Sequence, residues 1–251
     1  MTIPVPGLTL VAELDLPSHA HMALDEVLLE SVAAGRRPPL LRFWGWTQPT
    51  LILGSNQSVS NEVDQDAAAL RGFTITRRLS GGGTMLAEPG RTITWSLAIP
   101  TEPVARMSFV DSFAFLDAWA VEVLRGLGVD AGYRPLNDIV SPAGKIAGAA
   151  QARRRGALVH HVTMAYSMDP AALRELIRVG RPSVTEKGVR SANKVVSPLD
   201  TLLGASRAEV VAALAESSGA GPGRLERSEL EATAELAARK YARRDWIHRL
   251  P

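Results

Sequence analysis

The stretch Arg77-Arg78-Leu79-Ser80-Gly81-Gly82-Gly83-Thr84 follows a short alternating apolar run at residues 73–76. Three consecutive glycines are costly to order, which indicates that the backbone conformation here serves a purpose. Glycine lets the backbone approach a ligand closely, and successive N–H groups form a concavity suited to phosphate oxygens, with Arg77 or Arg78 adding charge. A flexible hairpin loop explains the triplet equally well, because neither the dinucleotide fingerprint nor the triphosphate-binding loop is present.

A second constellation lies further along the chain. Asn137-Asp138-Ile139-Val140 leads, across a turn at residues 141–144, to Lys145-Ile146-Ala147-Gly148-Ala149-Ala150-Gln151. The small residues after Lys145 leave space for a bound molecule. Taken alone, Lys145 is more simply interpreted as a solvated turn lysine.

Composition narrows the function classes. The chain has 251 residues, is 46% hydrophobic and contains no repeat, so we expect one domain with a sizeable core. It has no cysteine, which excludes disulfides, thiolate metal sites and a cysteine nucleophile. The formal net charge of +2 is too balanced to indicate a nucleic-acid partner. No apolar run is long enough for a membrane span, so we expect a cytoplasmic protein without a membrane partner.

The order of predicted elements favours an α+β fold with a mixed, largely antiparallel sheet flanked by helices. Alternating apolar residues predict strands at 40–44, 50–53, 92–99, 138–140, 145–152 and 157–168. Helical spacing predicts helices at 19–33, 108–127, 170–179, 207–217 and 229–241.

Together, these segments resemble the lipoate–protein ligase A family of the biotin/lipoate ligase superfamily. The resemblance extends over nearly the whole chain through further matches in order: Met22-Ala23-Leu24-Asp25-Glu26, Leu41-Arg42-Phe43-Trp44, Leu53-Gly54-Ser55-Asn56-Gln57, His160-His161-Val162-Thr163 and Val189-Arg190-Ser191. It implies a single catalytic domain over residues 1–251 without the accessory C-terminal domain of longer members.

The resemblance implies a two-step reaction. ATP activates a lipoate carboxylate as lipoyl-adenylate, and the acyl group then passes to a lysine of a carrier domain. Lys145 matches the essential lysine of the family, which contacts the carboxylate and the α-phosphate. Asp138 is a candidate to orient Lys145 or to hold Mg²⁺ on the phosphates. The implied adenylate- and lipoate-binding set is Arg78, Ser80, Gly81, Gly82, Gly83, Thr84, Met85, Asn137, Asp138, Gly148, Ala150 and Thr163.

The implied partners are lipoate and a lipoyl carrier. The carrier is a domain of a 2-oxoacid dehydrogenase, a protein of the glycine-cleavage H type or a dedicated lipoate-binding protein. A separate accessory protein is a further possible partner, since some single-domain members of the family need one.

Two positions depart from the family pattern, and two other functions stay open. Ala87 stands where most members have a histidine, and Val162 where they have a glycine, which puts the fit of the acyl tail in question. Octanoyl transfer from an acyl carrier protein, on the same fold, is one alternative, although those sister enzymes form a thioester on a cysteine. A non-catalytic lipoate or adenylate binder is the other.

Four histidines and a run of three arginines at residues 153–155 are predicted to have structural or surface roles. His19 and His21 are predicted to be capping or surface residues, and His160 and His161 to point to opposite faces of a strand, one of them buried and hydrogen-bonded beside the site. The run at residues 153–155 is predicted to be a solvated turn, with docking of an acidic carrier domain as the alternative.

Overall fold

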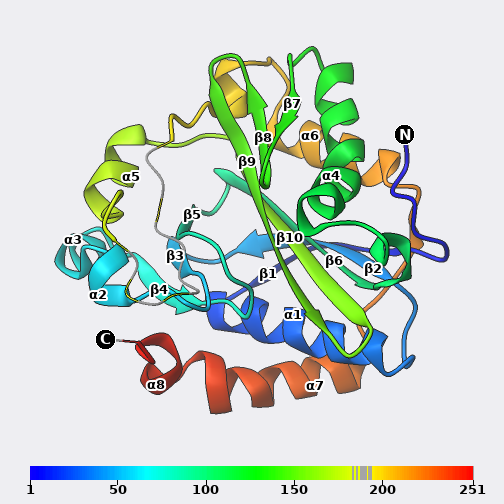
Figure 1. Cartoon of the computed structure of the whole chain (residues 1–251), viewed down its shortest axis with the longest axis horizontal. Helices are drawn as coiled ribbons and strands as arrows, with labels where there is room; N and C mark the ends of the chain where they lie inside the picture. The colour runs from blue at the N-terminus through cyan, green and yellow to red at the C-terminus, as the bar shows by residue number, and fades with distance from the viewer. Residues whose placement is uncertain (183, 185, 187–190, 192–193, 251) are drawn as a thin grey trace.

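Eight strands form the main sheet of the computed structural model, which describes residues 1–182, 184, 186, 191 and 194–250 (Figure 1). Their order is β11 (Gly221–Pro222), β1 (Thr9–Leu16), β2 (Leu40–Trp46), β6 (Thr92–Pro100), β10 (Ala157–Ala165), β9 (Gly144–Arg154), β8 (Asp138–Ser141) and β7 (Gly132–Arg134). β1 pairs in parallel with β11 and β2, and the other neighbours pair antiparallel. A smaller sheet has the order β4 (Thr74–Arg77), β3 (Thr50–Leu53) and β5 (Met85–Ala87).

Helices cover both faces of the main sheet. α1 (Ser18–Ala33) and α7 (Arg227–Leu236) lie together along one side, and α4 (Phe109–Gly126) and α6 (Arg207–Ser217) lie on the other (Figure 1). Alternate residues of a strand face opposite sides of the sheet: Leu41 packs in the core between the sheet and α4, and Leu40 packs in the core between the sheet and α1. The short helices are α2 (Val59–Glu62), α3 (Gln65–Leu70), α5 (Pro170–Leu176) and α8 (Arg244–Ile247). The predicted α+β class with a largely antiparallel sheet is confirmed.

Local sequence explains where α4 begins. Ser108 accepts the Asp111 N–H at 3.1 Å and donates its hydroxyl to the Asp111 carboxylate at 2.7 Å, so it caps the first turn. The helix ends before Gly128, whose φ of +90° suits glycine. Within the described part of the chain, neither this helix nor any other is long and apolar enough to cross a bilayer.

Some predicted boundaries were wrong. β10 ends at Ala165 instead of residue 168, because the next two N–H groups, of Tyr166 and Ser167, both turn to the carbonyl of Arg91. The last predicted helix, 229–241, is two elements: α7 ends at Leu236 and a π-helical turn continues over Ala237–Tyr241.

Candidate active site

A row of residues across five neighbouring strands forms one wall of a cavity of about 580 Å³. Asp138 on β8 pairs with Gly148 on β9, which pairs with Thr163 on β10. The row continues to Thr94 on β6 and Trp44 on β2. All five residues line the cavity. The register of the sheet therefore brings together five separate segments of the sequence.

The predicted site residues meet at this cavity. All of them except Ser80 line it: Arg78, Gly81, Gly82, Gly83, Thr84, Met85, Asn137, Asp138, Lys145, Gly148, Ala150 and Thr163. Apolar side chains of Met22, Ile52, Phe109 and Phe113 also line it, which gives the cavity surface for an acyl chain. The structure thus places both motifs at one site, while the role of each residue stays a prediction.

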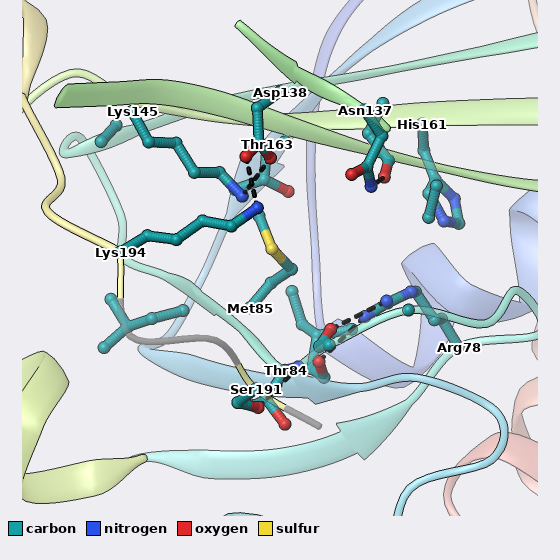
Figure 2. Close-up of a pocket in the computed structure, with 18 of the residues that line it drawn as sticks. Arg78, Thr84, Met85, Asn137, Asp138, Lys145, His161, Thr163, Ser191 and Lys194 are labelled. Atoms are coloured by element: carbon teal, nitrogen blue, oxygen red, sulfur yellow. Dashed lines mark hydrogen bonds and ion pairs between the residues drawn. The ribbon is translucent and has the colours of Figure 1, made fainter. Parts of the chain in front are cut away.

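Two lysines share one buried carboxylate in the cavity (Figure 2). Lys145 Nζ lies 2.9 Å from Asp138 Oδ1, and Lys194 Nζ contacts Asp138 Oδ2. The Asp138 side chain is 2% exposed and that of Lys145 is 20% exposed, whereas that of Lys194 is 41% exposed. Two ammonium groups against one carboxylate leave net positive charge, so the cluster can attract an anionic group or a developing oxyanion.

Lys145 is a strand residue with a fixed backbone. Its N–H donates to Val195 O at 2.8 Å, and its carbonyl accepts the Ser197 N–H at 2.8 Å. Burial lowers the pKa of Lys145 below that of an ordinary lysine, although the charge of Asp138 opposes this shift. These contacts contradict the simpler interpretation of Lys145 as a solvated turn lysine.

Arg78 holds the Gly-rich loop from within. Its Nη2 donates to Gly81 O at 2.6 Å and to Gly83 O at 2.9 Å, and its Nη1 donates to Ile52 O at 3.1 Å. Burial, together with the neighbouring charge of Arg77, lowers the pKa of Arg78 to about 10. The guanidinium of Arg78, which the sequence suggested as a phosphate ligand, therefore donates to the loop itself.

The loop glycines keep their own donors available. Among the described residues, no acceptor takes the N–H groups of Gly81, Gly82 or Gly83. Gly82 has a φ of +92°, a backbone conformation that favours glycine. The loop can therefore present successive N–H groups to an oxygen of a ligand, as its sequence predicts.

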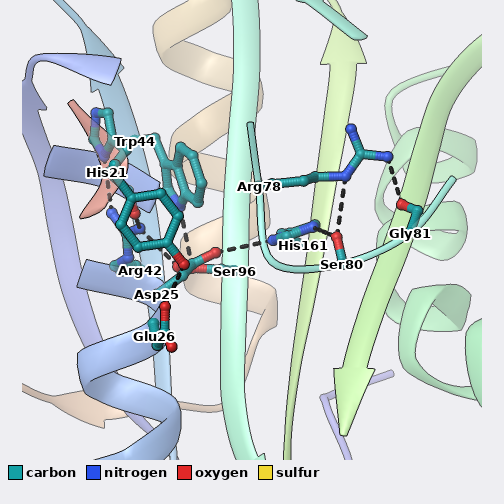
Figure 3. A network of polar contacts seen from close by, with 11 residues as sticks. His21, Asp25, Glu26, Arg42, Trp44, Arg78, Ser80, Gly81, Ser96 and His161 are labelled. Carbon is teal, nitrogen blue, oxygen red and sulfur yellow. Dashed lines mark hydrogen bonds and ion pairs between the residues drawn. The ribbon is translucent and has the colours of Figure 1, made fainter. Parts of the chain in front are cut away.

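Ser80 lies one layer behind the cavity wall. Its Oγ lies 2.6 Å from His161 Nε2 and accepts the Arg78 Nε–H at 3.0 Å (Figure 3). His161 lines the cavity and is 7% exposed, whereas His160, on the other face of β10, contacts Asp117 at 2.7 Å. The prediction that the two histidines face opposite ways, with one buried and hydrogen-bonded beside the site, is confirmed.

The end of the loop is fixed by a second set of hydrogen bonds. Thr84 donates its hydroxyl to Gln57 Oε1 at 3.0 Å, and its N–H to Ser191 Oγ at 3.3 Å. Ser191 in turn donates to Glu62 Oε2 at 2.7 Å. Val189 and Arg190, which belong to the same matched motif as Ser191, lie outside the described residues.

Sequence reasoning missed Lys194 and Ser191 as site residues. Lys194 lies 56 positions after its partner Asp138 and in no motif, so no local pattern could identify it. Ser191 did carry a signal, because its motif was matched by the resemblance. Asn137 donates its side-chain amide to Ala149 O, which ties the start of β8 to β9.

Asp138 does not form a magnesium site by itself. Both of its oxygens contact ammonium groups, and Mg²⁺ prefers several oxygen ligands. In the described part of the chain, no group of three or more His, Cys, Asp or Glu side chains could hold a metal ion. The residues therefore fit a metal ion only if a nucleotide supplies the other ligands.

The structure also places the two positions that depart from the family pattern, the arginine run and His21. Neither Ala87 nor Val162 lines the cavity: both are buried, Ala87 in a hydrophobic cluster that also contains Trp44, and Val162 in the core beneath α4. Arg154 and Arg155 are exposed, as predicted for a solvated run, and they pair at the surface with Glu26 and Glu30 at 2.9 Å and 3.0 Å. The surface prediction for His21 was wrong, because its side chain is fully buried.

Known proteins resemble this chain in sequence. The lipoyl protein ligase A/B catalytic domain matches residues 17–218. The octanoyltransferase LipM of Kyrpidia tusciae is 32% identical over 259 residues, covering 91% of this chain and 94% of the relative. The LipM of Geobacillus kaustophilus is 28% identical over 210 residues, covering 74% and 75%.

Solved structures share the fold. The bipartite lipoate protein ligase of Thermoplasma acidophilum, described with its E2 lipoyl domain, has a TM-score of 0.81 and 26% identity, covering 96% of this chain and 95% of that one. A lipoate–protein ligase A bound with ATP has a TM-score of 0.78 and 26% identity, covering 96% and 97%. The chain therefore belongs to the lipoyl protein ligase A/B catalytic-domain family, within the biotin/lipoate ligase superfamily.

Proposed function

We propose that the protein transfers an octanoyl or lipoyl group to a lysine of a lipoyl carrier domain. The observation that carries this proposal is the Lys145 ammonium, held by Asp138 in an acyl-sized cavity that the free glycine N–H groups also line. The octanoyltransferase relatives favour a thioester donor over the ATP-dependent ligation that the sequence first suggested.

The chemistry is attack of an amine on an activated carbonyl. The carrier lysine attacks the carbonyl carbon of the acyl thioester, so a C–N bond forms and the C–S bond breaks. The amine proton passes to the departing sulfur. Negative charge grows on the carbonyl oxygen before the C–S bond breaks, and the donors available to it are the Lys145 ammonium and the N–H groups of Gly81, Gly82 and Gly83.

The chain cannot use the cysteine thioester attributed to sister transferases, because it contains no cysteine. The proposed transfer is therefore direct, with donor and acceptor bound together. The same absence favours a second candidate, the ATP-dependent ligase, in which a free acid is activated as a mixed anhydride with AMP. The similarity to a ligase bound with ATP supports that candidate.

One experiment separates these functions. The purified protein is incubated with a lipoyl domain and either an octanoyl–acyl carrier protein thioester, or octanoate or lipoate with ATP and Mg²⁺, and the lipoyl domain is weighed by mass spectrometry. We expect acylation from the thioester without ATP, and acylation slowed roughly 100- to 1000-fold with Lys145→Ala. Acylation only from the free acid with ATP would establish the ligase instead. Binding of acyl ligands without acylation in either mixture would identify a non-catalytic binder.

A further inference from the structure

A buried chain of hydrogen bonds runs from α1 to the Gly-rich loop (Figure 3). Asp25 Oδ2 lies 2.9 Å from His161 Nδ1, and His161 Nε2 lies 2.6 Å from Ser80 Oγ. Arg78 then donates its Nε–H to Ser80 Oγ at 3.0 Å. All four residues are buried, with exposures of 1% for Asp25 and Ser80, 4% for Arg78 and 7% for His161.

The partners fix the direction of every hydrogen bond in this chain. Asp25 is a carboxylate that Arg42 and Ser96 also contact, at 2.7 Å and 2.8 Å, so it only accepts. His161 must then carry its proton on Nδ1, which leaves Nε2 to accept the Ser80 hydroxyl. The remaining acceptor capacity of Ser80 Oγ meets the Arg78 Nε–H.

This direction determines how the loop is held. Once Ser80 fixes the Nε side of Arg78, the Nη2 group of the same guanidinium meets the carbonyls of Gly81 and Gly83. Those two carbonyls are thereby tied to Arg78, while the glycines line the cavity and no acceptor among the described residues takes their N–H groups. Burial lowers the pKa of His161, with the charge of Asp25 opposing the shift, so the ring stays neutral and Nε2 stays an acceptor.

The connectivity is that of a Ser-His-Asp triad, yet Ser80 is badly placed to attack a substrate. The residue is buried and does not line the cavity, and its Oγ accepts the Arg78 Nε–H, which draws a lone pair away from any substrate. We propose that His161 is a positioning residue, which, through Ser80 and Arg78, holds the Gly-rich loop in the conformation that binds the reacting carbonyl. This proposal rests on the proposed acyl transfer for its activity measurements.

Chemical rescue tests the proposal. Because His161 lines the cavity, imidazole can enter the space left in His161→Ala. We expect His161→Ala to lose roughly 10- to 100-fold in kcat, the range known for orienting partners in metal sites. Imidazole should restore most of the loss, since it donates to Asp25 and accepts from Ser80. The probe 1-methylimidazole should not, because it has no N–H. Equal rescue by both compounds, or undiminished activity, would overturn the proposal.

A second measurement does not depend on the reaction. The Ser55 N–H donates to the Ser80 carbonyl at 2.7 Å, so hydrogen exchange of the Ser55 amide reports whether the loop is docked. We expect faster exchange in His161→Ala and recovery with imidazole. The matched control is His160→Ala, an equally buried histidine on the opposite face of β10, which should leave the Ser55 amide unchanged. Unchanged exchange in His161→Ala would refute the proposal even if the protein proves to transfer no acyl group.

Ser80→Ala provides a variant that keeps the histidine. It should lose activity to a similar extent and accelerate Ser55 exchange, and imidazole should rescue neither effect. Trapping of the wild-type protein with an acyl thioester should show no ester on Ser80 by peptide mass spectrometry. An acylated Ser80, or complete loss of turnover in Ser80→Ala with the loop still docked, would mean that Ser80 is a nucleophile and that the positioning role is wrong.

Discussion

The side chain of Lys145 occupies the space that a side chain at position 148 would need. A Cβ built on Gly148 would lie 2.4 Å from Lys145 Nζ and 2.9 Å from Lys145 Cε. Both residues line the cavity, and Asp138 fixes the ammonium at 2.9 Å. The glycine in the Lys145 motif is therefore explained by the lysine as much as by a bound molecule.

Gly148→Ala should reduce activity while leaving the fold intact. The added methyl displaces Lys145 Nζ, which is the flexible end of a side chain, and alanine is slightly more favourable than glycine inside a strand. We expect kcat to fall at least about 10-fold with no fall in the thermal midpoint, as a partial loss of the Lys145 contact. The control is Gly132→Ala in β7, where an added Cβ meets nothing within 4 Å. Activity of Gly148→Ala equal to that control would contradict the prediction.

Lys145→Ala should impair the chemical step more than binding. The ammonium strengthens its interaction as charge develops on the carbonyl oxygen, so its removal should cost about 2.7 to 4 kcal/mol, or roughly 100- to 1000-fold in kcat. Stability should change little, because Lys194 still contacts the Asp138 carboxylate. Lys145→Arg should not restore activity, since a planar guanidinium does not reproduce the compact ammonium that lies against Gly148. Steady-state kinetics and thermal unfolding of both variants check this. Near wild-type turnover of Lys145→Ala would exclude a catalytic role.

Substitution of Asp138 or of Lys194, the charged neighbours of Lys145, should shift the alkaline limb of the pH–activity profile in opposite directions. The active form of Lys145 is the ammonium, so activity is lost as pH rises through its pKa, which burial already lowers. The Asp138 charge raises that pKa and the Lys194 charge lowers it. We therefore expect Asp138→Asn to shift the alkaline limb of kcat/KM to lower pH, and Lys194→Ala to shift it to higher pH. The carrier lysine titrates equally in every variant. Shifts in the same direction would show that Lys145 does not set the limb.

Local sequence signals predicted several elements well. α4 was predicted within one residue at each end because Ser108 caps it and Gly126 and Gly128 mark its end. The β9–β10 hairpin was predicted because a turn at residues 153–156 separates two alternating runs, and Arg155 and Gly156 do adopt positive φ there. Strand β1 was missed because none of its residues is fully buried and half are exposed, and because it pairs in parallel with β2, which no local pattern encodes.

Site residues that lie in sequence motifs were predicted. Site residues that meet only through contacts between distant parts of the sequence were missed. The loop glycines and Lys145 belong to compact stretches, so a resemblance could locate them. Lys194 reaches Asp138 only through tertiary folding. The burial of His21 depends on Arg42 and Gly45, which lie 21 and 24 positions away, so helical position alone gave the wrong environment.

His21 should make the protein less stable in mild acid. Its Nε2 lies 2.7 Å from Gly45 O and its Nδ1 lies 3.0 Å from Arg42 Nη1, so the neutral ring uses both nitrogens. Burial, together with the charge of Arg42, lowers its pKa from 6.5 to about 3. As the pH falls below 6.5, His21 therefore binds a proton in the unfolded state but not in the folded state. The free energy of unfolding, which is at its full value above that pH, then falls by up to about 1.4 kcal/mol per pH unit.

Urea unfolding between pH 7.5 and 5 measures this loss before most carboxylates titrate. We expect the free energy of unfolding to fall with pH in the wild type. The decline should be shallower by up to about 1.4 kcal/mol per pH unit in His21→Gln, whose amide cannot titrate. Some slope should persist in that variant, because burial lowers the pKa of His161 in the same direction. Since the comparison uses slopes, a lower overall stability of His21→Gln does not affect it. Identical slopes for the two proteins would mean that His21 is already protonated in the folded state, with its ring rearranged away from Arg42.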